Sequence, residues 1–323
     1  MPLSPEQLAM RKTGLGASDM AEVICGSAMR VYAQKTTDTP FQTTERMELG
    51  NQLEPIIAAL YTRKYGVPLY RPNKTFRHPT EEWALATPDG LVMKGGKLLT
   101  DIDYGVEIKF VGRGMIHEWG KDGNDIPPRT MVQGLWSCDV VGVNRWDVGA
   151  LLCFEDPYLV ETGGGEKTLI VNGIVRFCTI KVSDNPVLME RVRELGRKFW
   201  FEHVVPNKAP RPDGRESTKD IIKLLHPDPA TGDLEEATDE EVKLISEEAI
   251  AEARFKHYRQ VYEQAKQSTD LAIGTRPGIF AAGVGRVTRK KDTRGAIRHN
   301  LKSAAPIGLL DIEKHPVKDW WED

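Results

Sequence analysis

The sequence lacks the features of membrane, secreted and zinc-binding proteins. No apolar run approaches the ~20 residues needed to cross a bilayer, and residues 1–20 hold no apolar signal-peptide core. The four cysteines show neither paired spacing nor a Cys-x-x-Cys motif, and the seven histidines form no metal-binding spacing. We therefore expect a protein of the reducing cytoplasm, with buried cysteines and no membrane partner.

The chain also lacks the overall basic excess of a passive nucleic-acid-binding protein. Its formal net charge is -3, but acidic residues concentrate at 233–252 and 320–323, whereas residues 286–302 are strongly basic. The cations of that basic segment include Arg289, Lys290, Lys291, Arg294, Arg298 and Lys302. Because a local basic surface attracts phosphate on any protein, residues 286–302 are a candidate contact for nucleic acid.

Apolar periodicity and turn-forming residues predict a mixed α/β core in the first two thirds of the chain. Apolar residues recur at helical spacing between residues 47 and 65, and Gly66 ends that segment. Ser18 is a candidate cap for a helix over residues 20–24. Further helices are predicted at 127–141 and 186–202, and strands within 83–110, at 146–154 and at 176–182. This order favours a mixed sheet flanked by helices.

A proline-rich segment at 207–214 predicts a boundary between a core at residues 1–210 and an extension at residues 211–323. In the extension, residues 239–273 predict one long helix or a pair of helices. Residues 278–285 and 286–291 predict a terminal hairpin that carries the basic segment.

Three carboxylates in the core suggest metal-dependent cleavage of a nucleic acid. Asp89 follows Pro88 on a predicted turn, Glu107 lies on a short apolar strand, and Glu54 lies on the helix at 47–65. Carboxylates delivered by a turn, a strand and a helix can hold divalent metal beside a phosphodiester. Lys109 shares the strand face of Glu107, because side chains alternate along a strand.

Each half of this pattern also has an ordinary structural explanation. On the order of one Glu-x-Lys triplet is expected by chance in a chain of this length, and Glu241-Val242-Lys243 is a second one in a charged helical segment. Pro-Asp recurs at 212–213 and 227–228, where a turn explains it. The context of Glu107 differs, because Val106, Ile108 and Phe110 form an apolar face opposite the two charged side chains.

Separated blocks of this sequence resemble the YqaJ-type viral recombinases, relatives of lambda exonuclease among the PD-(D/E)XK nucleases. The resemblance covers roughly residues 10–215 and implies a restriction-endonuclease-like PD-(D/E)XK core. The blocks are Gly14-Leu15-Gly16-Ala17-Ser18-Asp19, Gly50-Asn51-Gln52-Leu53-Glu54-Pro55, Ala86-Thr87-Pro88-Asp89-Gly90, Glu107-Ile108-Lys109 and Ile126-Pro127-Pro128 with Gln133.

The resemblance implies a hydrolase with two Mg²⁺ or Mn²⁺ ions per active site. Asp89 and Glu107 would bind the ions, the carbonyl of Ile108 would add a ligand, and Glu54 would complete the shell directly or through water. Lys109 would orient or deprotonate the attacking water and offset charge on the phosphate. The alternative for Glu54 is an acid on a helix surface.

The resemblance also implies a pocket for a terminal 5′-phosphate, formed by Arg11, Ser18, Thr87 and Gln133. Taken singly, these residues are more often an exposed arginine, a helix cap, a turn hydroxyl and a surface glutamine. Their joint occurrence favours the pocket.

The expected activity is 5′-to-3′ exonuclease digestion of linear double-stranded DNA, which leaves a 3′ single strand for a single-strand annealing protein. The family suggests a ring of three subunits in the cytoplasm of a bacterial host, with a phage or prophage origin. The alternatives are a DNA endonuclease of the same superfamily and a non-catalytic DNA-binding module with a degenerate site.

Overall fold

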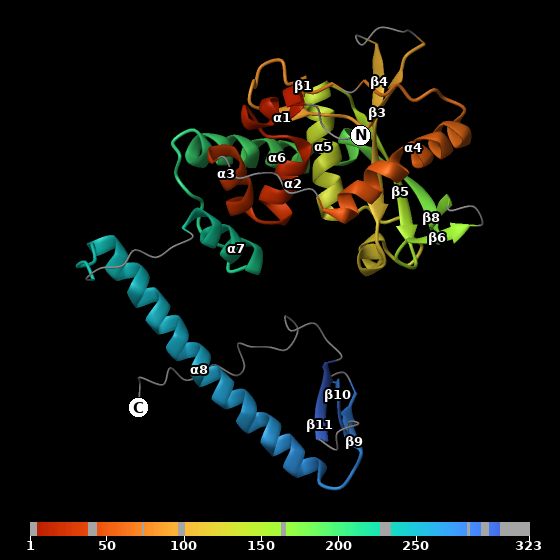
Figure 1. Ribbon diagram of the computed structural model, residues 1–323. Helices are drawn as coiled ribbons and strands as arrows, with labels where there is room; N and C mark the ends of the chain where they lie inside the picture. The colour runs from red at the N-terminus through yellow and green to blue at the C-terminus, as the bar shows by residue number, and fades with distance from the viewer. Residues whose placement is uncertain are drawn as a thin grey trace. The chain divides into compact units, whose positions relative to one another are not determined.

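The computed structural model describes residues 5–37, 44–72, 74–95, 101–162, 166–226, 234–282, 285–291 and 297–303. The chain divides into two compact units, Met1–Pro229 and Ala230–Asp323. Each unit has its own secondary structure (Figure 1). Within the described ranges, none of the helices is long and apolar enough to cross a membrane.

A four-stranded mixed sheet forms the centre of the first unit. Its order is β3-β4-β5-β8, with β3 at Gly90–Met93, β4 at Ile102–Val111, β5 at Arg145–Cys153 and β8 at Gly173–Lys181. Strands β4 and β5 are parallel, whereas β3 pairs with β4 and β8 pairs with β5 in the antiparallel direction. The predicted mixed α/β core is confirmed.

Helices cover both faces of this sheet. On one face, Leu53 and Ile57 of α4 (Glu45–Tyr65) belong to the same apolar cluster as Val106 of β4. On the other face, Leu135 of α5 (Pro128–Val141) belongs to a cluster with Val148 of β5.

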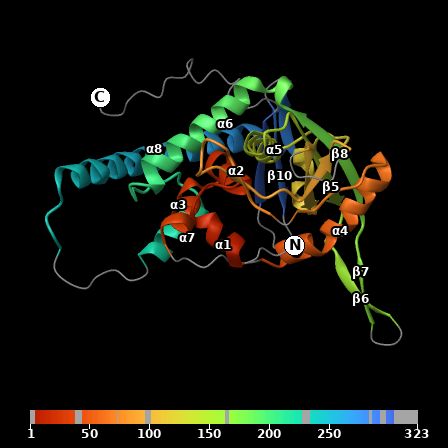
Figure 2. The same ribbon diagram turned by 90° about the horizontal axis from the view of Figure 1, so that it is seen from above.

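The other elements of this unit are α1 (Pro5–Lys12), α2 (Ala17–Cys25), α3 (Ala28–Thr36), β1 (Phe76–Arg77), β2 (Leu85–Ala86), β6 (Tyr158–Thr162), β7 (Glu166–Ile170), α6 (Pro186–Phe199) and α7 (Glu216–Leu225), with short 3₁₀ or π segments at Arg113–Trp119, Val182–Asp184 and Trp200–Val204. Strands β6 and β7 form a hairpin that projects from the unit (Figure 2).

The ends of α4 follow local sequence rules. The hydroxyl of Thr44 accepts a hydrogen bond from the N–H of Met47 at 3.3 Å, which satisfies a donor of the first turn. Gly66 ends the helix in the left-handed conformation with φ of 68°. These boundaries place Glu54 in the middle of the helix, as the sequence predicts.

Close approach at Gly14 brings the loop before α2 against the main chain of Trp83. The N–H of Leu15 donates to the carbonyl of Trp83 at 2.7 Å, and the N–H of Leu85 donates to the carbonyl of Leu15 at 2.9 Å. A Cβ on Gly14 would lie 2.2 Å from the Trp83 carbonyl oxygen. Only glycine permits this contact, which sets the start of α2 beside β2 and the turn that follows it.

The first unit continues beyond residue 210, where the sequence placed the end of the core. Helix α7 follows that position, and the hydroxyl of its Thr218 contacts the hydroxyl of Ser27 at 2.8 Å in a buried hydrogen bond. The compact unit ends at Pro229.

The second unit consists of one long helix and a small sheet. Helix α8 (Asp239–Ile273) begins with a capping box, in which the Thr238 side chain and the Glu241 side chain each bond the other residue's N–H. The sheet has the order β11-β10-β9, with β9 at Gly278–Ala281, β10 at Gly285–Lys291 and β11 at Ile297–Ser303. The predicted hairpin corresponds to β9 and β10, and β11 adds a third strand that the sequence did not predict.

Candidate active site

One pocket of the first unit receives most of the residues that the sequence singled out. It is lined from the start of the chain, from α4, from the turn between β2 and β3, and from β4. The predicted site residues in its wall are Arg11, Ser18, Glu54, Thr87, Asp89 and Glu107. Segments far apart in the sequence therefore meet at a single cavity.

Asp89 is held at the end of the turn by the neighbouring strand. The N–H of Ile108 donates to Asp89 Oδ2 at 2.8 Å, so this carboxylate and β4 are fixed relative to each other. Burial and the nearby charge of Glu107 raise the pKa of Asp89 to about 7. The two carboxylates thus repel each other where they face the pocket.

Glu107 and Lys109 lie on one face of β4, as their spacing predicts. Lys109 Nζ forms an ion pair with Glu107 Oε1. Val106 and Ile108 point to the opposite face and pack against α4. The apolar face of β4 thereby anchors the strand in the core, while the opposite face carries Glu107 and Lys109, the two side chains that could take part in a reaction.

Glu54 lies in the same pocket but is paired with a cation that the sequence did not single out. Its Oε1 accepts a hydrogen bond from Arg71 Nη2, and Arg71 Nε donates to the carbonyl of Asp89 at 3.3 Å. Arg71 also lines the pocket, together with Asn51 and Thr75. No group of three or more His, Cys, Asp or Glu side chains among the described residues is arranged to hold a metal ion. Glu54 thus shares the cavity with Asp89 and Glu107 without joining them in a three-ligand cluster.

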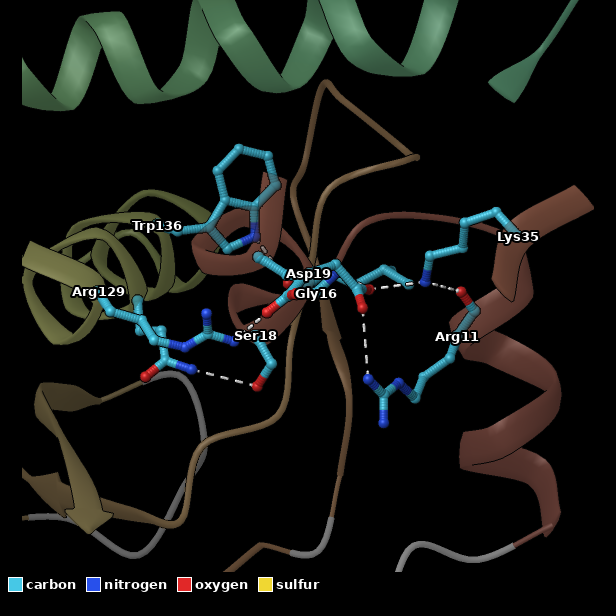
Figure 3. A network of polar contacts seen from close by, with 10 residues as sticks. Arg11, Gly16, Ser18, Asp19, Lys35, Arg129 and Trp136 are labelled. Carbon is cyan, nitrogen blue, oxygen red and sulfur yellow. Dashed lines mark hydrogen bonds and ion pairs between the residues drawn. The ribbon is translucent and has the colours of Figure 1, made fainter. Parts of the chain in front are cut away.

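A buried ion-pair network fixes Arg11 at the wall of the pocket (Figure 3). Asp19 Oδ1 accepts from Arg11 Nη2 at 3.3 Å, and Asp19 Oδ2 accepts from Lys35 Nζ at 2.6 Å. Lys35 Nζ also donates to the main-chain carbonyl of Arg11 at 2.5 Å. Arg11 is therefore held at both its main chain and its guanidinium.

Asp19 is charged in this network although it is almost fully buried. Burial alone would raise its pKa, but Lys35 and Arg11 outweigh that effect and lower the pKa below its ordinary value. Only 3% of the side chain of either Asp19 or Lys35 is exposed. Sequence reasoning included Asp19 in a motif but gave it no role, and it missed Lys35.

Ser18 is not the cap of α2, which corrects the prediction from sequence. Helix α2 begins at Ala17, and the cap position is Gly16, whose N–H donates to Asp19 Oδ2 at 2.8 Å. Asp19 therefore reaches back to the start of the helix and leaves Ser18 in the first turn. There the Ser18 hydroxyl accepts from Gln133 Nε2 of α5 at 3.2 Å.

The remaining predicted hydroxyl, that of Thr87, contacts the Thr75 hydroxyl at 2.9 Å. Gln133 is buried and reaches the pocket only through Ser18. The four residues expected around a terminal phosphate thus divide into three in the pocket wall and one that supports Ser18 from α5.

The part of the chain that holds all of these predicted residues matches a known family. Residues 6–144 match the family model described as the YqaJ-like viral recombinase domain. The resemblance inferred from the sequence blocks is thereby confirmed for this part of the chain. The matched region runs from α1 to just beyond the end of α5, so it includes every residue that lines the pocket.

One curated protein is similar over more of the chain. The uncharacterized protein YqaJ of Bacillus subtilis (strain 168) is 24% identical over 306 residues, which are 93% of this chain and 78% of that protein.

Solved exonuclease structures are also similar. The alkaline exonuclease LHK-Exo of Laribacter hongkongensis is 18% identical with a TM-score of 0.43, over 69% of this chain and 97% of that one. Its complex with dAMP is 20% identical with a TM-score of 0.44, over 69% and 98% of the two chains. A phage-related exonuclease of Haemophilus somnus 129PT is 10% identical with a TM-score of 0.33, over 64% and 91%.

Proposed function

We propose that this protein is a metal-dependent 5′-to-3′ exonuclease that digests linear double-stranded DNA and leaves 3′ single-stranded overhangs. The observation that carries the proposal is the pocket itself. Its lining includes carboxylates, one of them paired with a lysine, and also an arginine held by an ion pair and two hydroxyls. The terminal phosphate of a DNA strand and the phosphodiester to be cut are neighbouring groups. The arginine and hydroxyls suit the first, and the carboxylates and lysine suit the second.

The carboxylates suit Mg²⁺ or Mn²⁺, because hard cations prefer oxygen ligands and the mutual repulsion of Asp89 and Glu107 favours a cation between them. Asp89, Glu107 and the carbonyl of Ile108 would hold the metal, which we expect to be two ions, and Glu54 would complete the shell directly or through water. When bound, the metal supplies charge stabilisation and an activated water.

Lys109 is the proposed partner of the attacking water. Its ammonium lies beside Glu107, so it can donate a hydrogen bond to that water and offset negative charge on the phosphate. Glu107 holds the lysine in place at the same time.

Arg11, Ser18, Thr87 and Gln133 are the proposed binding residues for a 5′-phosphate. The planar guanidinium of Arg11 suits phosphate oxygens, and its two anchors restrict its orientation before DNA binds. Ser18 and Thr87 add hydroxyl groups at the same wall, and Gln133 orients Ser18.

The wider setting follows from the same proposal. We expect a ring of three subunits that acts with a single-strand annealing protein in the cytoplasm of a bacterial host, from a phage or prophage. In this setting residues 211–323 would contact DNA or the partner protein.

Digestion of three matched DNA substrates tests the function. With Mg²⁺ present, a linear duplex with 5′-phosphate ends should be degraded faster than the same duplex with 5′-hydroxyl ends, and a closed circle should stay intact. Cutting of circles at a similar rate would instead indicate an endonuclease. Binding of all three substrates without hydrolysis would indicate a non-catalytic DNA-binding module.

A further inference from the structure

The sheet of the second unit carries four cations on one face. In register, Arg286 of β10 lies opposite Lys302 of β11, and Lys290 lies opposite Arg298. Side chains at every second position of a strand share a face, so these four cations are on the same side of the sheet. We call them the basic face.

The opposite face of the same sheet is the one that packs on α8. Arg289 and His299 are also directly opposite each other, one position away from the basic residues. Arg289 Nε lies 3.3 Å and His299 Nδ1 lies 3.0 Å from Asp270 Oδ1 of α8. Val287 on this side is buried. The alternation of the strands therefore directs the basic face away from α8.

The basic face places like charges in direct opposition, which destabilises a sheet. Among the described residues, Arg286, Lys290 and Lys302 form no ion pair with an acid that would balance this repulsion, in contrast to Arg289 on the other face. The two rows of cations are four residues apart, or about 13 Å along the strands. A chain of phosphates would relieve the repulsion in both rows at once.

An exposed aromatic ring extends one of these rows. Phe280 of β9 lies opposite Arg286, and 84% of its surface is exposed. A ring beside cations offers a stacking surface for a base, and bases present a free face when the strand is single, whereas in a duplex both faces are stacked. This feature favours a single strand over a duplex.

We propose that the basic face and Phe280 bind single-stranded DNA, with phosphates on Arg286, Lys290, Arg298 and Lys302 and a base on Phe280. The surface would hold the single strand that the proposed exonuclease leaves, but the binding itself does not depend on hydrolysis. It can therefore be measured on the full chain in EDTA, where a failure of the nuclease proposal has no influence.

Fluorescence anisotropy with a labelled oligothymidylate and with a duplex of equal length tests the proposal. The variant Arg286→Ala/Lys290→Ala/Arg298→Ala/Lys302→Ala should lose at least about tenfold in affinity for the single strand, and its salt dependence should fall by about three counterions. Phe280→Ala should lose about fivefold or more on the single strand and little on the duplex.

The matched control is Lys243→Ala/Arg254→Ala/Lys256→Ala/Arg259→Ala, which removes two lysines and two arginines from exposed positions of α8. It should change single-strand affinity less than about twofold. Equal losses in the two quadruple variants, or unchanged single-strand binding in the basic-face variant, would overturn the proposal. The basic face could instead bind the acidic first turn of α8 in a second copy of the protein. If the basic-face variant lost this self-association but kept its affinity for single-stranded DNA, the proposal would also be overturned.

Photochemical crosslinking of the unaltered protein gives an independent check in case the quadruple variant does not fold. Bromouracil in the oligonucleotide should crosslink to peptides of β9, β10 or β11, identified by mass spectrometry. Crosslinks confined to the first unit would refute the proposal.

Discussion

Two buried aspartates of the site differ in the charges around them: Asp89 lines the pocket, and Asp19 lies behind Arg11 of its wall. Asp19 has two cations, Lys35 and Arg11, within ion-pair distance, and its pKa lies below the ordinary value. Asp89 is buried beside a second carboxylate, Glu107, and burial together with that charge raises its pKa to about 7. The negative charge of Asp19 is therefore more than balanced, whereas Asp89 and Glu107 share one lysine, Lys109. We call the surroundings of Asp19 the balanced side of the site and those of Asp89 and Glu107 the cation-poor side. The first side suits an anion and the second suits a cation.

The largest effect is expected from removing the lysine on the cation-poor side. Lys109→Ala should lower DNA hydrolysis by about a thousandfold or more, because the attacking water and the phosphate lose their cationic partner. DNA affinity in EDTA should stay within about twofold of the unaltered protein. The control is Lys121→Ala, a lysine outside the pocket. Hydrolysis at the normal rate in Lys109→Ala would refute the role of this side chain.

The next effect concerns stability on the balanced side. Asp19→Asn leaves the Lys35 ammonium buried without its carboxylate and should lower the free energy of unfolding by about 3 to 5 kcal/mol in urea titrations at pH 7. The control Glu194→Gln, which breaks an exposed ion pair with Arg191, should change little.

The same pair of proteins gives a pH test. Because the pKa of Asp19 is lowered in the folded state, its stabilising contribution is present above its unfolded value near 3.8 and is lost as the pH falls through the folded value. The difference in unfolding free energy between the unaltered protein and Asp19→Asn should thus be constant from about pH 5 to 8 and shrink below about pH 4. A difference that grows on acidification would contradict the charged state assigned to Asp19.

A smaller effect is expected for metal binding by the cation-poor side. Mn²⁺ at a hundredfold excess over its dissociation constant should increase the free energy of unfolding of the unaltered protein by about 2.7 kcal/mol. This increase should appear as an upward shift of the thermal unfolding midpoint. Asp89→Asn should abolish this shift, whereas Asp139→Asn, which breaks the ion pair of a buried aspartate with the partly exposed Arg193 outside the pocket, should keep it. An equal Mn²⁺ response in both variants would show that the cation binds at another place.

The smallest effect is expected from one hydroxyl on the anion side. Ser18→Ala should reduce the ratio of digestion rates for 5′-phosphate and 5′-hydroxyl ends by about tenfold, the lower value for one hydrogen bond to a charged group. Ser183→Ala, an exposed serine outside the pocket, serves as the control. A ratio that does not change in Ser18→Ala, together with a normal preference in the unaltered protein, would exclude Ser18 from phosphate binding.

The sequence predicts the elements whose side chains follow a regular pattern. The apolar alternation around Glu107 and the helical spacing around Glu54 both describe single elements, and both agree with the structure. The meeting of Glu54, Asp89 and Glu107 in one pocket was suggested by their chemistry and strengthened by the family resemblance of their motifs. Spacing within one element does not say which elements lie side by side.

The missed residues depend on contacts between elements. Lys35 meets Asp19 only because α3 packs against α2, and Arg71 meets Glu54 from a segment without regular periodicity. Ser18 was taken for a cap because serine is common there, but Asp19 bonds the Gly16 N–H and the helix begins earlier. The third strand of the terminal sheet was missed because its residues, Ile297–Ser303, alternate polar and apolar side chains only weakly.

The contact at Gly14 fixes the distance between two segments that line the pocket. The main chain that carries Arg11 and Ser18 rests directly on the main chain that leads through Leu85 to Thr87 and Asp89. An alanine at position 14 would place a methyl group between these two main-chain segments and push them apart. Arg11 would then move away from the carboxylates, although none of these side chains is changed. The working distance of the site is thus set by a residue that has no side chain.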